Sequence, residues 1–181
     1  AFADTPDVPI SRDTTLTLGG RTFEIEVPGT AHTPGDLVIW LPDARVLFAG
    51  DLLIEDGVAM VVDGSSSGLL SALDRLERLA PRAVLPGHGR IPANPEDLVR
   101  LTRCETLALR ARMRDDVRQG VSMSRALASL PPADRDRPVS RNSRVRRNAV
   151  RIYAEMEQEM VHSTDAASAS SDSVAMLSCR R

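Results

Sequence analysis

Three side chains of types that bind metal ions lie in glycine-containing turns, each after a predicted apolar strand. His32 lies in Gly-Thr-Ala-His-Thr-Pro-Gly-Asp, Asp51 directly follows Val-Leu-Phe-Ala-Gly, and His88 lies in Pro-Gly-His-Gly. Strand ends hold a ligand rigidly, and a neighbouring glycine lets the backbone approach a metal closely. Two neutral imidazoles and one carboxylate suit zinc, iron or manganese. The pattern therefore indicates a candidate metal site.

Each of these residues also has an ordinary interpretation. A single histidine in a turn is usually a polar loop residue, and an aspartate after Ala-Gly is commonly a turn former or a helix cap. Asp51 is the least ordinary of the three, because a carboxylate at the end of an apolar strand needs a partner. The residues by themselves leave both interpretations open.

The elements that must position these residues follow from hydrophobic periodicity and turn signals. Gly19-Gly20 predicts a hairpin in a mainly antiparallel region, and later apolar residues recur with helical spacing, with Ser66 or Ser67 as a first N-cap. The expected strands are 14–18, 21–27, 37–41, 46–49 and 83–85, and the expected helices are 69–80, 94–119, 122–130 and 142–160.

The chain is therefore expected to form an α/β core over residues 14–92 and a helical extension over 93–161. Residues 1–13 are predicted to form an irregular lead-in without regular secondary structure. Residues 162–181 are expected to be a disordered tail, because they lack the apolar content that offsets ordering entropy.

Composition excludes several classes of protein. The chain has 181 residues, a formal charge of −2 and 27% charged residues, which argues against bulk electrostatic attraction to nucleic acid or membrane. No apolar run approaches the length that spans a bilayer, and the first twenty residues lack the apolar segment of a signal peptide. Cys104 and Cys179 lie far apart, so neither a disulfide framework nor a cysteine metal site is expected.

Three sequence blocks carry a resemblance to a known family. His-Thr-Pro-Gly-Asp at 32–36, Val-Leu-Phe-Ala-Gly-Asp at 46–51 and Leu-Pro-Gly-His-Gly at 85–89 resemble, in order and spacing, the second half of a metallo-β-lactamase-fold metallohydrolase. The later helices resemble those of the bacterial quinoprotein-relay or SoxH-like zinc hydrolases. The resemblance implies an αββα sandwich, represented here by its second half and a C-terminal helical extension.

The resemblance also implies a site with two zinc ions, or with iron or manganese in their place. His32 would bind one ion, His88 would bind the other, and Asp51 would bridge both as the catalytic residue. A metal-bound hydroxide would then attack an ester, thioester, lactone or lactam. Residues that would support these ligands without binding metal are Asp36, which would orient the loop of His32, and Gly87 and Gly89, which would permit the turn at His88.

The sequence departs from the family at one place. The motif His-x-His-x-Asp-His, which supplies the remaining ligands, is absent, and His162 is the only other histidine. Each ion would keep two ligands, so the chain alone is expected to bind metal weakly and to be inactive. A truncated hydrolase is the leading explanation and a diverged, non-catalytic remnant the alternative. Loss of the first half would expose the apolar sheet face of 37–49 and 83–85, which predicts self-association.

Other functions remain open. An iron-dependent oxidoreductase of the same fold would use similar ligands. Ribonuclease Z-like processing would use the arginine-rich stretch 135–151, although acids interleave with it and the only aromatic residue near it is Tyr153. The helices of 94–161 could instead act as a docking surface or as a lid over the metal site. β-Lactamases of the best-known zinc subclass carry cysteine at the position of Asp51, which disfavours that activity.

The expected partner is a small-molecule substrate, with neither nucleic acid nor membrane. The expected location is the cytoplasm, or the periplasm if an upstream signal peptide is missing.

Overall fold

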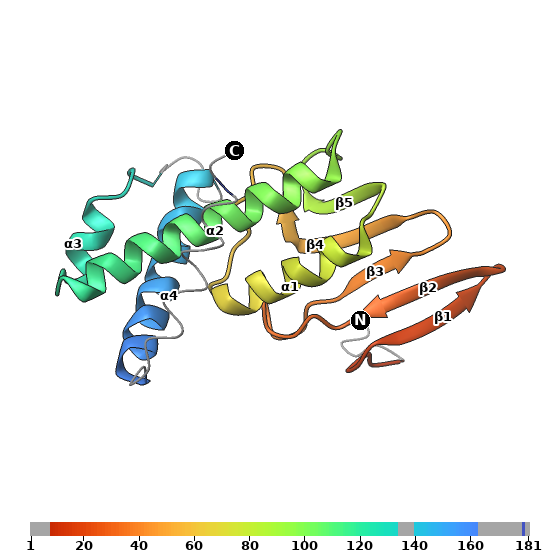
Figure 1. Ribbon diagram of the computed structural model, residues 1–181, viewed down its shortest axis with the longest axis horizontal. Coiled ribbons are helices and arrows are strands. Elements are labelled where there is room, and N and C mark those ends of the chain that lie inside the picture. Colours follow the sequence, from red (N-terminus) through yellow and green to blue (C-terminus); the bar gives the residue numbers. More distant parts are fainter. Residues whose placement is uncertain (1–7, 134–139, 163–178, 180–181) are drawn as a thin grey trace, which may run out of the picture.

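A computed structural model of the chain describes residues 8–133, 140–162 and 179. Part of the predicted lead-in and most of the predicted disordered tail lie outside these described residues. The described part forms one sheet and four helices, which confirms the predicted α/β class (Figure 1).

The sheet contains five strands in chain order, β1-β2-β3-β4-β5. The first four pair antiparallel, as predicted, and β5 pairs parallel to β4 after a crossover through a helix. Gly19 and Gly20 join β1 to β2 with positive φ angles of 59° and 75°, the backbone that a tight hairpin favours. The strands are β1 (Thr14–Leu18), β2 (Arg21–Glu26), β3 (Val38–Leu41), β4 (Val46–Ile54) and β5 (Ala83–His88).

The helices begin close to the positions that capping residues predict. Asn94 caps the second helix by accepting a hydrogen bond from the Glu96 amide, with Pro95 at the first position. The first helix is capped by Ser65, one residue before the predicted caps, because Ser66 is already helical and buried. The helices are α1 (Ser66–Leu79), α2 (Pro95–Arg118), α3 (Met123–Ala128) and α4 (Arg141–His162).

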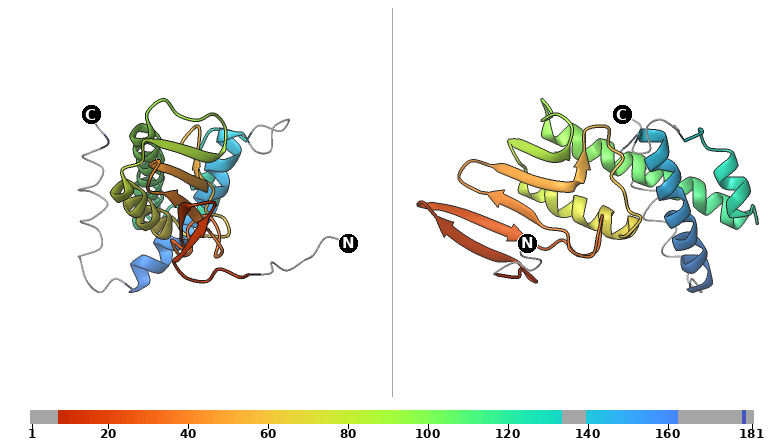
Figure 2. Two further views of the ribbon diagram at one scale, coloured as in Figure 1. Left: turned by 90° about the vertical axis from the view of Figure 1, so that its right-hand side faces the viewer. Right: turned by 180° about the vertical axis from the view of Figure 1, so that it is seen from behind.

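The core lies between one face of the sheet and α1 with α2 (Figure 2). Leucines at three- and four-residue spacing place Leu69, Leu73 and Leu76 of α1 in this core, fully buried. They pack with Leu47 and Val84 in one hydrophobic cluster, which fixes the sheet beneath the helix. Burial of each such side chain contributes about 1.5–3 kcal/mol to folding.

The opposite face of the sheet is also apolar. Pairing places Ile25, Ile39, Phe48 and Leu85 side by side across four strands. Phe48 is 40% exposed, so this face is less well covered than the face toward α1.

Strand β4 is longer than predicted, and this changes the position of Asp51. The sequence predicts that Asp51 follows a strand ending at Ala49, whereas β4 continues through Asp51 to Ile54. The parallel pairing with β5 shifts register on both sides of Gly50, whose φ is +53°. A glycine tolerates this left-handed backbone, so the strand bends at Gly50 without ending.

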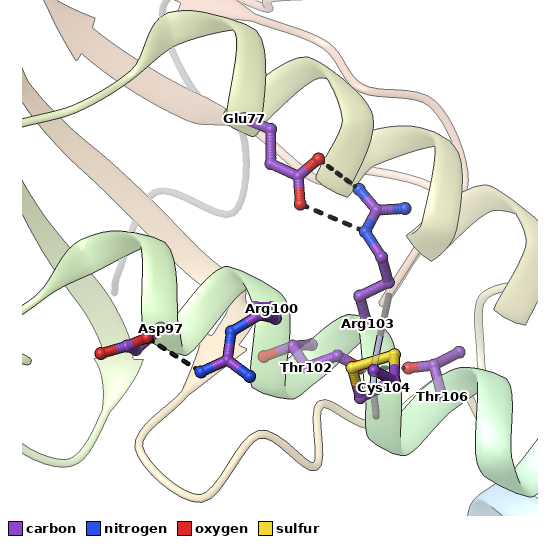
Figure 3. Close-up of a disulfide and its surroundings, with 8 residues drawn as sticks. Glu77, Asp97, Arg100, Thr102, Arg103, Cys104 and Thr106 are labelled. Atoms are coloured by element: carbon purple, nitrogen blue, oxygen red, sulfur yellow. Dashed lines mark hydrogen bonds and ion pairs between the residues drawn. A yellow bond between two sulfur atoms is a disulfide. The ribbon is translucent and has the colours of Figure 1, made fainter. Parts of the chain in front are cut away.

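The prediction of no disulfide framework is wrong for the two cysteines. Cys104 of α2 and Cys179 are joined by a disulfide that closes a sequence separation of 75 residues, with Cα atoms 5.6 Å apart (Figure 3). That Cα distance is ordinary for a disulfide. Separation along the chain gave no measure of their distance, because Cys179 lies beside α2 although it is 75 positions from Cys104.

None of the helices in the described ranges is long and apolar enough to cross a membrane.

Candidate metal centre

The three predicted ligands come together at one end of β4 and β5. The Asp51 carboxylate lies between two imidazoles: Oδ2 is 3.4 Å from Nε2 of His32, and Oδ1 is 3.4 Å from Nε2 of His88. His32 comes from the loop between β2 and β3, Asp51 from within β4, and His88 from the last position of β5. Each oxygen of one carboxylate therefore faces a different histidine.

The two nitrogen–oxygen distances of 3.4 Å are longer than a hydrogen bond and match the spacing of two ligands on one metal ion. They exceed the usual 2.7–3.2 Å of an N–H···O hydrogen bond. Two ligands that share one tetrahedral zinc ion, each about 2.0–2.1 Å from it, lie about 3.3 Å apart. The spacing of each His–Asp pair thus fits two donors to a common ion.

The orientation of the His32 ring is set by a backbone carbonyl. Nδ1 of His32 lies 2.7 Å from the Met60 carbonyl oxygen. Because a carbonyl can only accept, Nδ1 carries the proton, and in the neutral imidazole the lone pair is on Nε2. That lone pair faces the Asp51 carboxylate, an arrangement that is favourable only with a proton or a cation between them.

The loop of His32 is held by Asp36. The Asp36 carboxylate accepts hydrogen bonds from the His32 amide at 2.7 Å and from the Thr33 amide at 3.0 Å, and it also accepts one from the Thr33 hydroxyl. Gly64 packs against the same loop, where a Cβ would lie 1.8 Å from the Ala31 carbonyl oxygen. The His32 backbone is thus fixed from two sides.

The predicted turn at His88 is part of β5, which continues through His88 and not only to residue 85, and two glycines flank His88. A Cβ on Gly87 would lie 2.0 Å from Oδ1 of Asp51, so only glycine lets β5 pass this close to the carboxylate. Gly89 has a φ of +94° and packs against Glu55. The side-chain hydrogen bond from Arg90, together with one from its amide, holds the pKa of Glu55 below its ordinary value.

The donor set fits metal ions in part. Within the described residues, no group of three or more His, Cys, Asp or Glu side chains is placed to hold one ion. The available donors instead form two pairs, His32 with Asp51 and Asp51 with His88. His162 lies apart from both pairs in sequence position, and its Nδ1 is hydrogen bonded to the Gln158 carbonyl in its own helix.

Sequence reasoning missed the contacts that orient His32 from outside its own loop. The Met60 carbonyl carries no sequence signal, because any residue could supply it. Asn148 of α4, which binds the backbone beside Met60, is a polar residue between Val145 and Ile152 on the apolar stripe of that helix. A buried amide on such a stripe needs partners, and that signal could have indicated it.

Comparisons with known proteins agree on one family. The family model described as Metallo-beta-lactamase superfamily matches residues 1–88. The chain is 32% identical over 89 residues to a hydroxyacylglutathione hydrolase of Rhodobacter capsulatus, covering 49% of this chain and 34% of that protein. It is 27% identical over 89 residues to a metallo-beta-lactamase type 2 of Bacteroides fragilis, covering 46% of this chain and 36% of that protein.

A solved metallo-beta-lactamase from Pontibacter korlensis is 31% identical, with a TM-score of 0.49, and the match covers 54% of this chain and 47% of that one. The chain spans about a third of the length of the two curated relatives.

Proposed function

We propose that the complete protein is a metal-dependent hydrolase with His32, Asp51 and His88 among its metal ligands, and the match of the metallo-beta-lactamase superfamily model to residues 1–88 supports this reaction class. The observation that carries the proposal is the Asp51 carboxylate, which presents one oxygen to each imidazole at 3.4 Å. The curated relatives are hydrolases, which supports the reaction class.

The chain's own residues have separate roles in this proposal. Asp51 would hold one cation with each of its two carboxylate oxygens. His32 offers Nε2 because the Met60 carbonyl keeps the proton on Nδ1. Asp36 orients the His32 loop, and Gly87 allows β5 to bring His88 to the carboxylate.

Zinc is the proposed metal, with iron or manganese as alternatives. When bound, a zinc ion would lower the pKa of water to near 7 and stabilise the negative charge that develops on a substrate oxygen. The proposed substrates are thioesters or esters. One relative acts on hydroxyacylglutathione, a thioester. The β-lactamase resemblance assigns cysteine to the position of Asp51, which makes a lactam the weaker choice.

Each ion would receive two donors from His32, Asp51 and His88, whereas catalytic zinc usually takes three from the protein. We therefore propose that further donors come from beyond the described residues, and that the 181-residue chain alone binds zinc weakly and does not turn over substrate.

The test compares the 181-residue chain with the complete gene product. Metal analysis and a thioester-hydrolysis assay are expected to give stoichiometric metal and turnover in the complete protein and neither in the chain. A complete protein that is purified without metal and gains no hydrolysis on addition of zinc contradicts the proposal. Iron as the sole metal, with oxygen consumption, would instead favour the oxidoreductase.

Nucleic-acid processing has less support. Within the described part of the arginine-rich stretch, Arg144 pairs with Asp56, Arg141 with Glu105, and Arg146 donates to the Leu127 carbonyl. These internal pairs reduce the charge available for phosphates. We propose a small-molecule substrate, and neither nucleic acid nor membrane as a partner.

We also propose that the face bearing Phe48 and Leu85 mediates self-association of the isolated chain. Light scattering is expected to show oligomers, and Phe48→Glu is expected to reduce them, with Val8→Glu as an exposed apolar control far from that face in sequence. A compact monomer of the unaltered chain would contradict this.

For the compartment, the disulfide favours the periplasm over the cytoplasm, since disulfides persist mainly in oxidising environments. Thiol alkylation of the native protein without reductant is expected to label neither cysteine.

A further inference from the structure

The segment of residues 59–61 belongs to no strand or helix, although Ala59 and Val61 are buried and Met60 between them is half-buried. Ala59 and Val61 are 3% and 0% exposed, so their backbone polar groups need partners within the protein. Asn148 of α4 supplies two of them: its Nδ2 donates to the Ala59 carbonyl at 2.8 Å, and its Oδ1 accepts from the Val61 amide at 3.0 Å. One side-chain amide therefore pairs with the chain on both sides of Met60.

The residue between these two anchors supplies the carbonyl that orients His32. The Met60 oxygen accepts from Nδ1 of His32 at 2.7 Å. The Asn148 amide fixes both flanking peptides, and with them the direction of the Met60 carbonyl. A chain of three contacts thus runs from α4 to the imidazole that faces Asp51.

A second residue on the same face of α4 holds the preceding part of the segment. Arg144, one helical turn before Asn148, donates to the Val58 carbonyl at 3.1 Å and pairs with Asp56. Arg144 does not contact residues 59–61 through these bonds. Substituting Arg144 therefore tests whether it is enough to hold the segment against α4, and substituting Asn148 tests whether the Met60 carbonyl itself must be oriented.

We propose that Asn148 is a positioning residue that, through the Met60 carbonyl, sets the tautomer and orientation of the His32 imidazole. The effect of Asn148 on metal binding rests on the proposed function. Its effect on the His32 tautomer does not, because the tautomer is a property of the chain without metal. In this proposal α4, part of the helical extension, orients the His32 imidazole through the Met60 carbonyl. A lid would instead cover the site.

The test uses ¹⁵N-histidine-labelled chain, whose three histidines give resolvable imidazole signals. At about pH 8, where an ordinary imidazole is neutral, His32 is expected to carry its proton on Nδ1. In Asn148→Leu, the ratio of Nδ1–H to Nε2–H tautomers is expected to fall about fivefold, which corresponds to the loss of one ordinary hydrogen bond. Asn142→Leu, at an exposed position of the same helix, and Arg144→Gln are expected to leave the ratio unchanged.

Zinc titration of the complete protein supplies the second readout. Asn148→Leu is expected to lower zinc affinity about 10–100-fold, the usual effect of losing a group that orients a ligand. An equal loss in Arg144→Gln would mean that attachment of the segment alone matters, and would overturn the proposal.

The remaining outcomes are also decisive. A wild-type His32 protonated on Nε2, or an Asn148→Leu variant with an unchanged tautomer ratio, overturns the positioning role whatever the zinc result. If the ratio changes but the wild type binds no zinc, the positioning role stands and the proposed function fails. If Asn148→Leu does not fold, the nearly isosteric Asn148→Asp, which cannot donate to the Ala59 carbonyl, decides the same comparison.

Discussion

His32 and His88 face the same carboxylate from two regions that are built differently. The His32 side chain is 17% exposed, and both its ring and its loop are hydrogen bonded to other parts of the protein. The His88 side chain is 70% exposed and is positioned mainly by the backbone of β5 and the glycines beside it. In one half of the candidate site both the backbone and the ring are therefore held by the protein, and in the other half only the backbone is held.

This difference indicates where the described residues leave the site incomplete. A ligand with an exposed ring depends on the metal or on further protein to select its orientation, whereas a ligand with a bonded ring does not. We infer that the His32 pair binds its ion more tightly than the His88 pair. Variants of the Asp51 carboxylate, of Gly87 where β5 approaches it, and of the residues that support each histidine distinguish these contributions.

The largest effect is expected at the shared residue. Asp51→Asn removes the negative charge and replaces one of the two oxygen donors by an amide nitrogen that does not bind metal, so one ion would lose a ligand and the other would keep only a neutral oxygen. Zinc affinity of the complete protein is expected to fall more than about 100-fold, beyond the 10–100-fold typical of outer partners. Asp43→Asn, in the exposed turn between β3 and β4, is the matched control. Retention of both ions in Asp51→Asn, measured by metal analysis, would refute a bridging role.

The next effect is expected where β5 approaches β4. In Gly87→Ala the new Cβ would meet Oδ1 of Asp51 at 2.0 Å, so the strand or the carboxylate must move. The free energy of unfolding is expected to fall by about 1–3 kcal/mol, measured by urea denaturation, and the site is expected to lose metal affinity. Gly35→Ala, where no atom lies within 4 Å, is expected to change neither. An unaltered stability in Gly87→Ala would show that β5 can move aside freely.

A smaller effect is expected to distinguish the two sides. Asp36→Ala removes the hydrogen bonds that close the His32 loop, and zinc affinity is expected to fall about tenfold. Glu55→Ala, beside His88, breaks an exposed pair with Arg90 and is expected to change affinity much less. Isothermal titration of both variants makes the comparison. Equal losses would show that the two halves of the site are supported alike.

The sequence predicted the elements whose signals are local. The Gly19-Gly20 hairpin and the Asn94 cap depend on a few adjacent residues, and both are present. The extension of β4 past Asp51 was not predicted, because Gly50 and Asp51 end the apolar run while pairing with β5 continues the strand.

Contacts between distant segments were harder to predict. The bonds of Asn148 to residues 59–61 span 87 and 89 positions, and the disulfide spans 75, so no spacing in the chain encodes them. The grouping of His32, Asp51 and His88 was predicted because each follows a predicted strand near a glycine, and because the three blocks resemble a family; in the structure Asp51 and His88 lie within β4 and β5. Their roles as ligands stay a prediction.

The smallest effect concerns the acid dependence of the His88 side. Hydrogen bonds from Arg90 depress the pKa of Glu55 in the folded protein below the ordinary 4.5, so the ionised form stabilises the fold above that pH. As the pH falls through the lower folded value, this stabilisation is lost. Melting temperatures of wild type and Glu55→Gln are therefore expected to differ slightly at neutral pH and to converge in acid. Because the pair is exposed, added salt is expected to reduce the difference. A difference that grows as the pH falls would show that Glu55 is held in its protonated form, and that the turn at His88 is supported by something other than this ion pair.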